Sequence, residues 1–216
     1  MAQLFNRSAN ALAKVTLIVG FLAAAGGAWA SYEFYHSPYM TRVDLVREQP
    51  VMFSHKHHVE GLGIDCRYCH TSVEVSSSAG IPSTHTCMSC HSQVWVDAPI
   101  LEPVRASYRE NLPLEWIRVN DLPDFVYFDH SIHVGKGIGC TTCHGPIDQM
   151  PLVRQVHNLS MKWCLDCHRN PEAFVRPREE VFNVNWQPPA DQLEMGGRLV
   201  QEYGIETKTY CSACHR

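Results

Sequence analysis

The stretch Cys66-Arg67-Tyr68-Cys69-His70 decides how this chain folds, because its pattern, Cys-x-x-Cys-His, occurs five times in 216 residues. The other copies begin at Cys87, Cys140, Cys164 and Cys211, and together the five contain all 10 cysteines. The pattern is typical of covalent attachment of c-type haem, in which both thiols bond to the porphyrin and the histidine binds the iron.

Zinc sites and redox dithiols also use Cys-x-x-Cys, but neither requires a histidine directly after every second cysteine. We therefore predict five covalently bound haem c groups. The thioether residues are then Cys66, Cys69, Cys87, Cys90, Cys140, Cys143, Cys164, Cys167, Cys211 and Cys214. The proximal iron ligands are His70, His91, His144, His168 and His215.

A second motif, Phe-x-His-x-x-His, precedes two of the haem motifs, at Phe53 and at Phe128. Each copy is followed by two haem motifs, which defines an internal repeat of units 53–91 and 128–168. Histidines three positions apart lie on one side of a helical turn and can reach two different irons. We predict that the distal ligands of four haems are His55, His58, His130 and His133.

The fifth haem, at residues 211–215, lies outside the repeat and has no second histidine nearby in sequence. Its sixth ligand must come from elsewhere in the chain. Met150 and Met161 are the methionine candidates, and a methionine ligand would give this haem a higher potential than a second histidine. The histidines that remain open as alternatives are His36, His57, His85 and His157.

Residues 15–32 contain no charged side chain and follow Arg7 and Lys14, with no acidic residue before them. This pattern predicts a transmembrane anchor with residues 1–14 in the cytoplasm and the haem domain on the periplasmic side of a bacterial inner membrane. Aromatic residues near the end of the segment, including Trp29 and Tyr32, fit an interfacial belt. The alternative is a cleaved signal peptide, since Ala28-Trp29-Ala30 resembles a cleavage site.

Residues 33–52 are then a polar stalk, and residues 53–216 form the haem domain. The proline-rich stretch 96–124 is predicted to be a surface connector, and residues 191–203 are predicted to form a helix. Residues 33–216 provide only about 37 residues per haem, so the haems must share one core. We predict a mainly α fold with much irregular structure, built from cytochrome c3/c7-like units in which haem fills the interior.

Composition excludes other classes of protein. A formal net charge of −4 argues against a nucleic-acid binder that relies on positive charge. A hydrophobic content of 45% argues against a disordered chain.

Three stretches carry a resemblance to a known family: Gln49 to His58, Leu62 to His70, and Met161 to Arg169. They resemble the membrane-anchored pentahaem subunit of bacterial alternative complex III. The resemblance implies an electron-transfer subunit without a catalytic site of its own, in a respiratory or photosynthetic complex that oxidises quinol. The implied partners are integral-membrane subunits, iron–sulfur or molybdopterin-like subunits, other cytochrome c subunits, and a soluble acceptor such as cytochrome c or a copper protein.

Two other functions are weighed against this one. A multihaem reductase needs an iron with an open position, but no motif has the Cys-x-x-Cys-Lys form and the spare histidines outnumber the irons. A stand-alone membrane quinol dehydrogenase would oxidise quinol without partner subunits.

Overall fold

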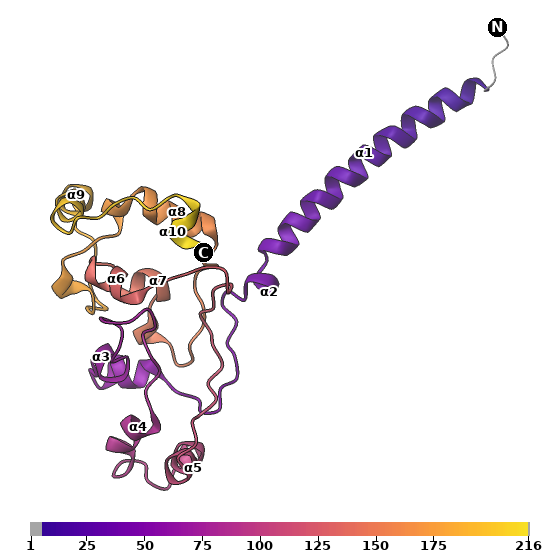
Figure 1. The fold of residues 1–216 in the computed structure, drawn as a ribbon. Coiled ribbons are helices and arrows are strands. Elements are labelled where there is room, and N and C mark those ends of the chain that lie inside the picture. Colours follow the sequence, from indigo (N-terminus) through magenta and orange to yellow (C-terminus); the bar gives the residue numbers. More distant parts are fainter. Residues whose placement is uncertain (1–5, 216) are drawn as a thin grey trace. The chain divides into compact units, whose positions relative to one another are not determined.

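The computed structural model describes residues 6–215. Residues 1–5, which begin the predicted cytoplasmic segment, and Arg216, which ends the predicted haem domain, lie outside the described residues. The chain divides into two compact units, residues 1–43 and residues 44–216. Figure 1 shows the path of the chain through both.

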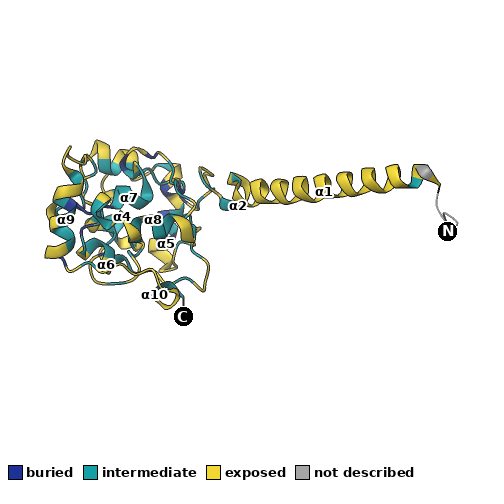
Figure 2. Cartoon of the chain, turned by 90° about the horizontal axis from the view of Figure 1, so that it is seen from above, coloured by how far each residue is buried: buried dark blue, intermediate teal, exposed yellow. Residues whose placement is uncertain are grey.

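The first unit is dominated by one long helix, α1 (Arg7–His36), followed by the short helix α2 (Pro38–Thr41). Ser37, between them, is extended and donates its backbone N–H to the Phe34 carbonyl, which ends α1. The side chains of α1 are exposed along nearly its whole length, as Figure 2 shows. By length and composition α1 is a candidate membrane span.

The second unit consists of short helices joined by irregular segments. In chain order they are η1 (Lys56–Gly61), α3 (Cys66–Cys69), α4 (Thr84–His91), η2 (Pro99–Leu101), α5 (Glu102–Glu110), α6 (His130–Gly135), α7 (Cys140–His144), η3 (Ile147–Gln149), α8 (Met161–Arg169), η4 (Pro171–Ala173), η5 (Arg178–Glu180), α9 (Gln192–Glu202) and α10 (Cys211–Cys214). Residues 6–215 contain no β-strand, and their β pairing is limited to isolated bridges such as the one between Ile138 and Val175. The predicted mainly α, irregular fold is confirmed.

Every Cys-x-x-Cys-His motif begins a helix or lies within one. In α3 the Asp65 carboxylate accepts from the backbone N–H of Arg67, and in α8 the Ser160 hydroxyl accepts from that of Trp163. Such caps satisfy backbone N–H groups that a first helical turn leaves without partners. Each motif therefore presents its two cysteines and its histidine from about one turn of chain.

The predicted surface connector 96–124 differs from the expectation, because it contains η2 and α5. Pro99 and Pro103 lie in the first turns of these helices, where a missing backbone N–H costs nothing. Leu101 and Val104 then pack against Val51 in a small apolar cluster. The prolines start helices here and do not exclude them.

The repeat predicted from the sequence differs by one residue between its two copies. Phe53 lies 13 positions before Cys66, whereas Phe128 lies 12 positions before Cys140. In the first copy η1 is a π-helix, and in the second α6 is an α-helix. A π-helix takes up one extra residue in a turn. The insertion is thus absorbed locally, between the histidine pair and the first cysteine.

The predicted helix at 191–203 is confirmed as α9, and a glycine sets how closely it packs. A Cβ built on Gly196 would lie 2.0 Å from the Glu172 carbonyl oxygen, next to η4. The Gln192 amide donates to the carbonyls of Glu172 and Val175, at 2.9 Å each. The backbones of α9 and η4 are therefore nearly in contact at this position.

This contact predicts that replacing two adjacent glycines by alanine has opposite effects on stability. Gly196→Ala should destabilise the protein by about 1–3 kcal/mol, because the new methyl group meets backbone that cannot move aside. Gly197→Ala is the matched control: no atom lies within 4 Å of its Cβ position, so it should be neutral or stabilising by up to about 1 kcal/mol. Thermal unfolding followed by circular dichroism measures both, and equal melting temperatures would contradict the packing argument.

Candidate haem-binding site

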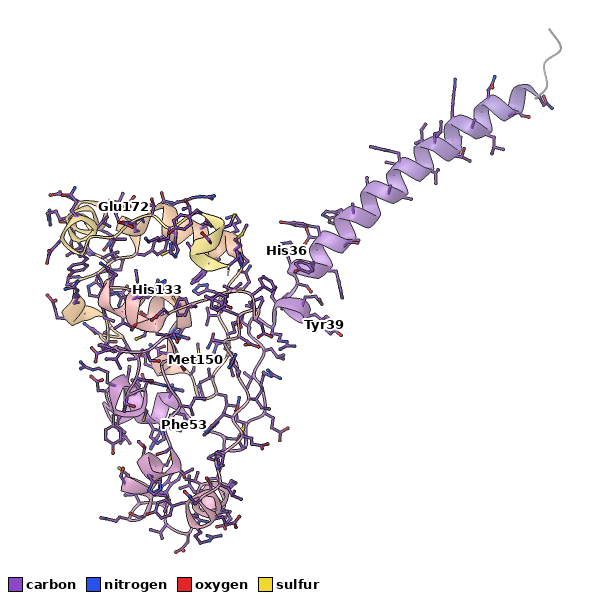
Figure 3. All side chains as sticks on the ribbon, viewed as in Figure 1. His36, Tyr39, Phe53, His133, Met150 and Glu172 are labelled. Carbon is purple, nitrogen blue, oxygen red and sulfur yellow. The ribbon has the colours of Figure 1, made fainter. Side chains whose placement is uncertain are left out.

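The two copies of Phe-x-His-x-x-His place their rings in the same arrangement. The Phe53 ring lies edge-on to His55 and stacks on His58, with centroid distances of 4.9 and 4.4 Å. The Phe128 ring does the same with His130 and His133, at 4.8 and 4.4 Å. The phenylalanine thus holds both histidines of its copy, and Figure 3 labels Phe53 and His133, one from each.

Each of these four histidines faces the histidine of a haem motif. The centroid distances are 6.4 Å for His55 and His70, 6.2 Å for His58 and His91, 6.4 Å for His130 and His144, and 6.1 Å for His133 and His168. A metal–imidazole bond is about 2 Å, so an iron between two rings separates their centres by about 6 Å. The structure therefore brings together the predicted distal and proximal histidines in four pairs, and their spacing fits an iron.

A hydrogen bond also holds the Nδ1 atom of most of these rings. The Nδ1 atoms of His58, His70 and His133 donate to the carbonyls of Ser54, Gly80 and Asp129, at 2.7–2.9 Å. A carbonyl can only accept, so these Nδ1 atoms carry the proton and leave the Nε2 lone pair for a metal. The same arrangement holds for His91 with Val94, His130 with Ser77 and His215 with Phe125.

Burial favours the neutral form of five of the facing histidines. It lowers the pKa of His55 and of His144 to about 4 each, and neighbouring histidines add to the effect. It also lowers the pKa values of His58, His133 and His168. Only the neutral ring offers a lone pair to a metal, so these rings are ready to bind iron at neutral pH.

The cysteine pairs lie next to one another in a fixed order. Burial raises the pKa of Cys69, and the nearby thiols of Cys87 and Cys90 contribute. A hydrogen bond to the Cys66 sulfur, together with burial, raises the pKa of Cys140. Burial raises the pKa of Cys143 to about 12, with Cys167 and Cys164 nearby.

The Cys164 motif and the Cys211 motif are the last neighbours in this order. Burial raises the pKa of Cys164, and the Cys214 thiol contributes. The spatial order of the motifs is therefore Cys87, Cys66, Cys140, Cys164 and Cys211, which is not their order in the sequence. In Figure 1, α4, α3, α7 and α8 follow one another from the bottom of the second unit to its top.

The protein alone leaves much apolar surface uncovered near these motifs. Among the described residues the buried hydrophobic side chains are only Val51, Val73, Leu101, Val104, Met150, Val175, Val181 and Tyr203. Large apolar side chains close in sequence to the haem motifs stay exposed, among them Leu62, Tyr68, Val94, Trp95, Phe125, Phe128 and Ile132. Apolar surface of this extent requires a cover, and flat macrocycles beside the cysteines fit that requirement.

The candidates for the fifth distal ligand differ in their surroundings. The Met150 side chain is 1% exposed, and its carbonyl accepts from the Lys56 backbone N–H, so it packs against the first repeat and away from the C-terminal motif. Figure 3 draws it between Phe53 and His133. Met161 is 67% exposed and lies one helical turn before Cys164, the cysteine that neighbours Cys214.

Within residues 6–215 no histidine ring faces His215, which packs on Phe125 at 5.8 Å. The spare histidines pack on other rings. His36 packs on Tyr32, His57 on Trp95, His85 on Tyr108 and His157 on Trp163. The sixth ligand of the C-terminal haem stays a prediction, and the surroundings favour Met161 over Met150.

Comparison with known proteins agrees with this geometry. The family model described as cytochrome c7 and related cytochrome c matches residues 126–216, the second repeat and the C-terminal motif. The chain is a multihaem cytochrome c. It is also similar to a curated protein of Nitratidesulfovibrio vulgaris (strain Hildenborough), named menaquinone reductase, multiheme cytochrome c subunit. The two are 36% identical over 124 residues, 57% of this chain and 54% of the relative, so this multihaem cytochrome matches about half of that protein's length.

Two features of this cytochrome were not found from its sequence. The Ser77 carbonyl, in the first repeat, accepts from both the backbone N–H and Nδ1 of His130 in the second. Arg176, one of two arginines in a proline-rich stretch, is buried beside the Cys140 motif. A backbone carbonyl has no residue signature, and nothing in the local pattern marks Arg176 as buried.

The ring planes predict two spectroscopic classes of haem. The planes are parallel within 2° for His55/His70 and for His130/His144, but inclined by 67° and 73° in the other two pairs. This angle sets the splitting of the ferric d orbitals. Electron paramagnetic resonance (EPR) of the oxidised protein should therefore show two rhombic low-spin signals and two with a much larger maximal g value.

Substitution of two adjacent histidines, one at a time, tests which pair of rings gives which class of EPR signal. His58→Ala should remove one of the large-g signals, whereas His57→Ala, which alters a ring stacked on Trp95, should leave all four. A single class of signal in the wild-type protein would contradict the ring geometry.

Proposed function

We propose that this chain is an electron conductor with five covalently bound haem c groups, each held by the two cysteines of one motif. The proximal ligands are the histidines of the five motifs, and the distal ligands of four haems are His55, His58, His130 and His133. The four facing pairs of histidine rings carry this proposal. Two imidazoles on an iron leave no open position for a substrate, so these haems pass electrons and bind no small molecule.

The neighbouring cysteine pairs support a continuous path. Electrons would move along the motifs in the spatial order Cys87, Cys66, Cys140, Cys164, Cys211. What this chain contributes is positioning: two thioether anchors and a histidine from each helical turn, and a second histidine from a turn that phenylalanine holds in place. The haem supplies the one-electron chemistry.

The membrane assignment is part of the same proposal. Residues 15–32, within α1, span a bacterial inner membrane, and residues 33–52 connect the span to the periplasmic haem domain, 53–216. The exposed apolar surface of α1 and the basic residues Arg7 and Lys14 on its N-terminal side support this orientation. The haem-bearing unit then lies where it can meet a soluble electron acceptor.

We further propose that the chain works within a quinone-linked membrane complex. Its resemblance to the pentahaem subunit of alternative complex III favours quinol oxidation, with integral-membrane, iron–sulfur and other cytochrome subunits as partners. The name of the curated relative, a menaquinone reductase subunit, supports the opposite direction, in which electrons reach menaquinone. The two candidates share the conductor and differ in the direction of electron flow between it and the quinone.

Rapid mixing of the purified membrane complex distinguishes these directions. If the complex oxidises quinol, a menaquinol analogue should reduce the haems within the turnover time, and the isolated chain should not react. Reduction of the quinone form of the analogue by chemically reduced haems, without the reverse reaction, would favour the second candidate. Rapid quinol oxidation by the isolated chain would overturn both and identify a stand-alone dehydrogenase.

Carbon monoxide tests whether every iron has two protein ligands. The reduced wild-type protein should not bind it, whereas Met161→Ala should open one of five haems to it. Met150→Ala is the matched control: it should leave carbon monoxide binding absent and destabilise the fold by about 2–5 kcal/mol, because it empties a buried site. Binding by the intact wild-type protein would instead favour a reductase.

A further inference from the structure

A buried cation lies against the Cys140 haem motif. The Arg176 side chain is 4% exposed, and its Nη2 donates to the hydroxyls of Thr141 and Thr142 at 3.3 and 3.2 Å. These are the two residues between Cys140 and Cys143. The guanidinium also lies over the Trp186 ring, 4.3 Å from its centre. Arg176 is thus fixed between the haem motif and an aromatic ring.

This charge has no carboxylate in contact with it. Among residues 6–215 no carboxylate lies within ion-pair distance of Arg176. The Glu180 carboxylate accepts from the Asn183 amide at 2.6 Å and acts on Arg176 only through space, with no direct contact. Burial lowers the pKa of Arg176, but an arginine stays protonated in proteins. Once haem is attached, Cys140 is a neutral thioether, so a full positive charge remains beside the macrocycle.

The corresponding position in the first repeat is different. The residue before Cys140 is Gly139, and a Cβ there would lie 2.2 Å from the Arg176 guanidinium carbon. The residue before Cys66 is Asp65, whose carboxylate pairs with Arg67 through two hydrogen bonds of 2.9 and 2.8 Å. The first motif therefore has an exposed ion pair where the second has a buried cation without an ion pair.

The facing histidine rings of the two haem sites have the same placement. Their facing rings have the same separation, 6.4 Å, and the same angle, 2°. A difference in hydrogen bonding opposes the effect of the Arg176 charge on the reduction potential. His130 Nδ1 donates to the Ser77 carbonyl, whereas His55 Nδ1 is buried without a partner. A hydrogen bond at Nδ1 strengthens the ligand and favours ferric iron. It leaves the ring neutral, however, so the buried unit charge is the larger effect.

We propose that Arg176 raises the reduction potential of the haem at Cys140 above that of the haem at Cys66. This inference rests on the proposed function. A buried cation stabilises ferrous iron relative to ferric iron, because ferrous iron carries one less positive charge. One electron then leaves ferrous iron at the Cys66 motif and reduces ferric iron at the Cys140 motif, and no proton is needed. Arg176 thereby directs electrons from the first repeat to the second at the junction where the two meet.

The test is an EPR-monitored redox titration of the full-length chain, after a haemochrome assay has counted its haems. These two haems form the class with parallel ligand planes, so their signals are separate from the others. Arg176→Gln should lower one midpoint potential of this class by at least the equivalent of a tenfold change in equilibrium constant, about 59 mV for one electron. Arg176→Lys, which keeps the charge, should lower it much less.

Two further variants separate charge from structure. Arg178→Gln is the matched control: Arg178 lies over the Tyr203 ring and donates to the Gly135 carbonyl, but it is exposed, so both potentials should stay unchanged. Thr142→Asp keeps Arg176 and gives it a carboxylate, and should lower the same potential. If Arg176→Gln does not assemble with its haems, the midpoint potential of Thr142→Asp tests the proposal in its place.

The outcomes distinguish the inference from the proposed function. Fewer than five haems in the wild-type chain would contradict the proposed function. Five haems with both potentials unchanged in Arg176→Gln, or in Thr142→Asp where Arg176→Gln does not assemble, would overturn the role of Arg176. Equal shifts in Arg176→Gln and Arg176→Lys would also overturn it, because they would show an effect of structure and not of charge.

Discussion

Two imidazole rings that face each other at a spacing that fits one iron are the arrangement on which this structure depends. A Cys-x-x-Cys-His turn can supply only one of them, because its cysteines hold the same macrocycle. The second ring must come from another segment, at a distance that varies only from 6.1 to 6.4 Å among the four pairs. The histidine turns η1 and α6, the phenylalanine that fixes each, and the carbonyls at Nδ1 all serve this spacing.

The same requirement explains why so little of the protein is buried. A chain that places each haem with short helices and loops does not need large helix–helix interfaces, and the described residues contain only small apolar clusters. Packing is tight instead at particular points. Gly196 allows α9 to approach η4, and Gly139 makes room for Arg176. Each glycine lies where a side chain would displace an element that supports a haem motif.

The two repeats are similar in ligand geometry but unequal in their surroundings. The extra residue of the first repeat is absorbed in the π-helix η1, so the ring pairs His55/His70 and His130/His144 keep the same separation and angle. What surrounds each pair is not duplicated: Arg176 lies beside the second repeat, and the Ser77 carbonyl reaches across to His130. Duplication thus preserves the facing of the histidine rings, while single residues, such as Arg176 outside the repeat and Ser77 within its first unit, make its copies different.

The sequence by itself determined the covalent chemistry and the internal repeat, because thioether attachment requires cysteines and histidine at fixed short spacing, which is visible in any one motif. It also predicted the apolar helix α1 and the helix α9, whose patterns are local. It did not predict α5, since prolines that begin a helix look like prolines that prevent one.

Only the tertiary structure decided which histidine faces which, the order of the motifs in space, and the burial of Arg176. These depend on contacts between residues far apart in the chain, such as Cys66 with Cys140, and no local pattern encodes such contacts.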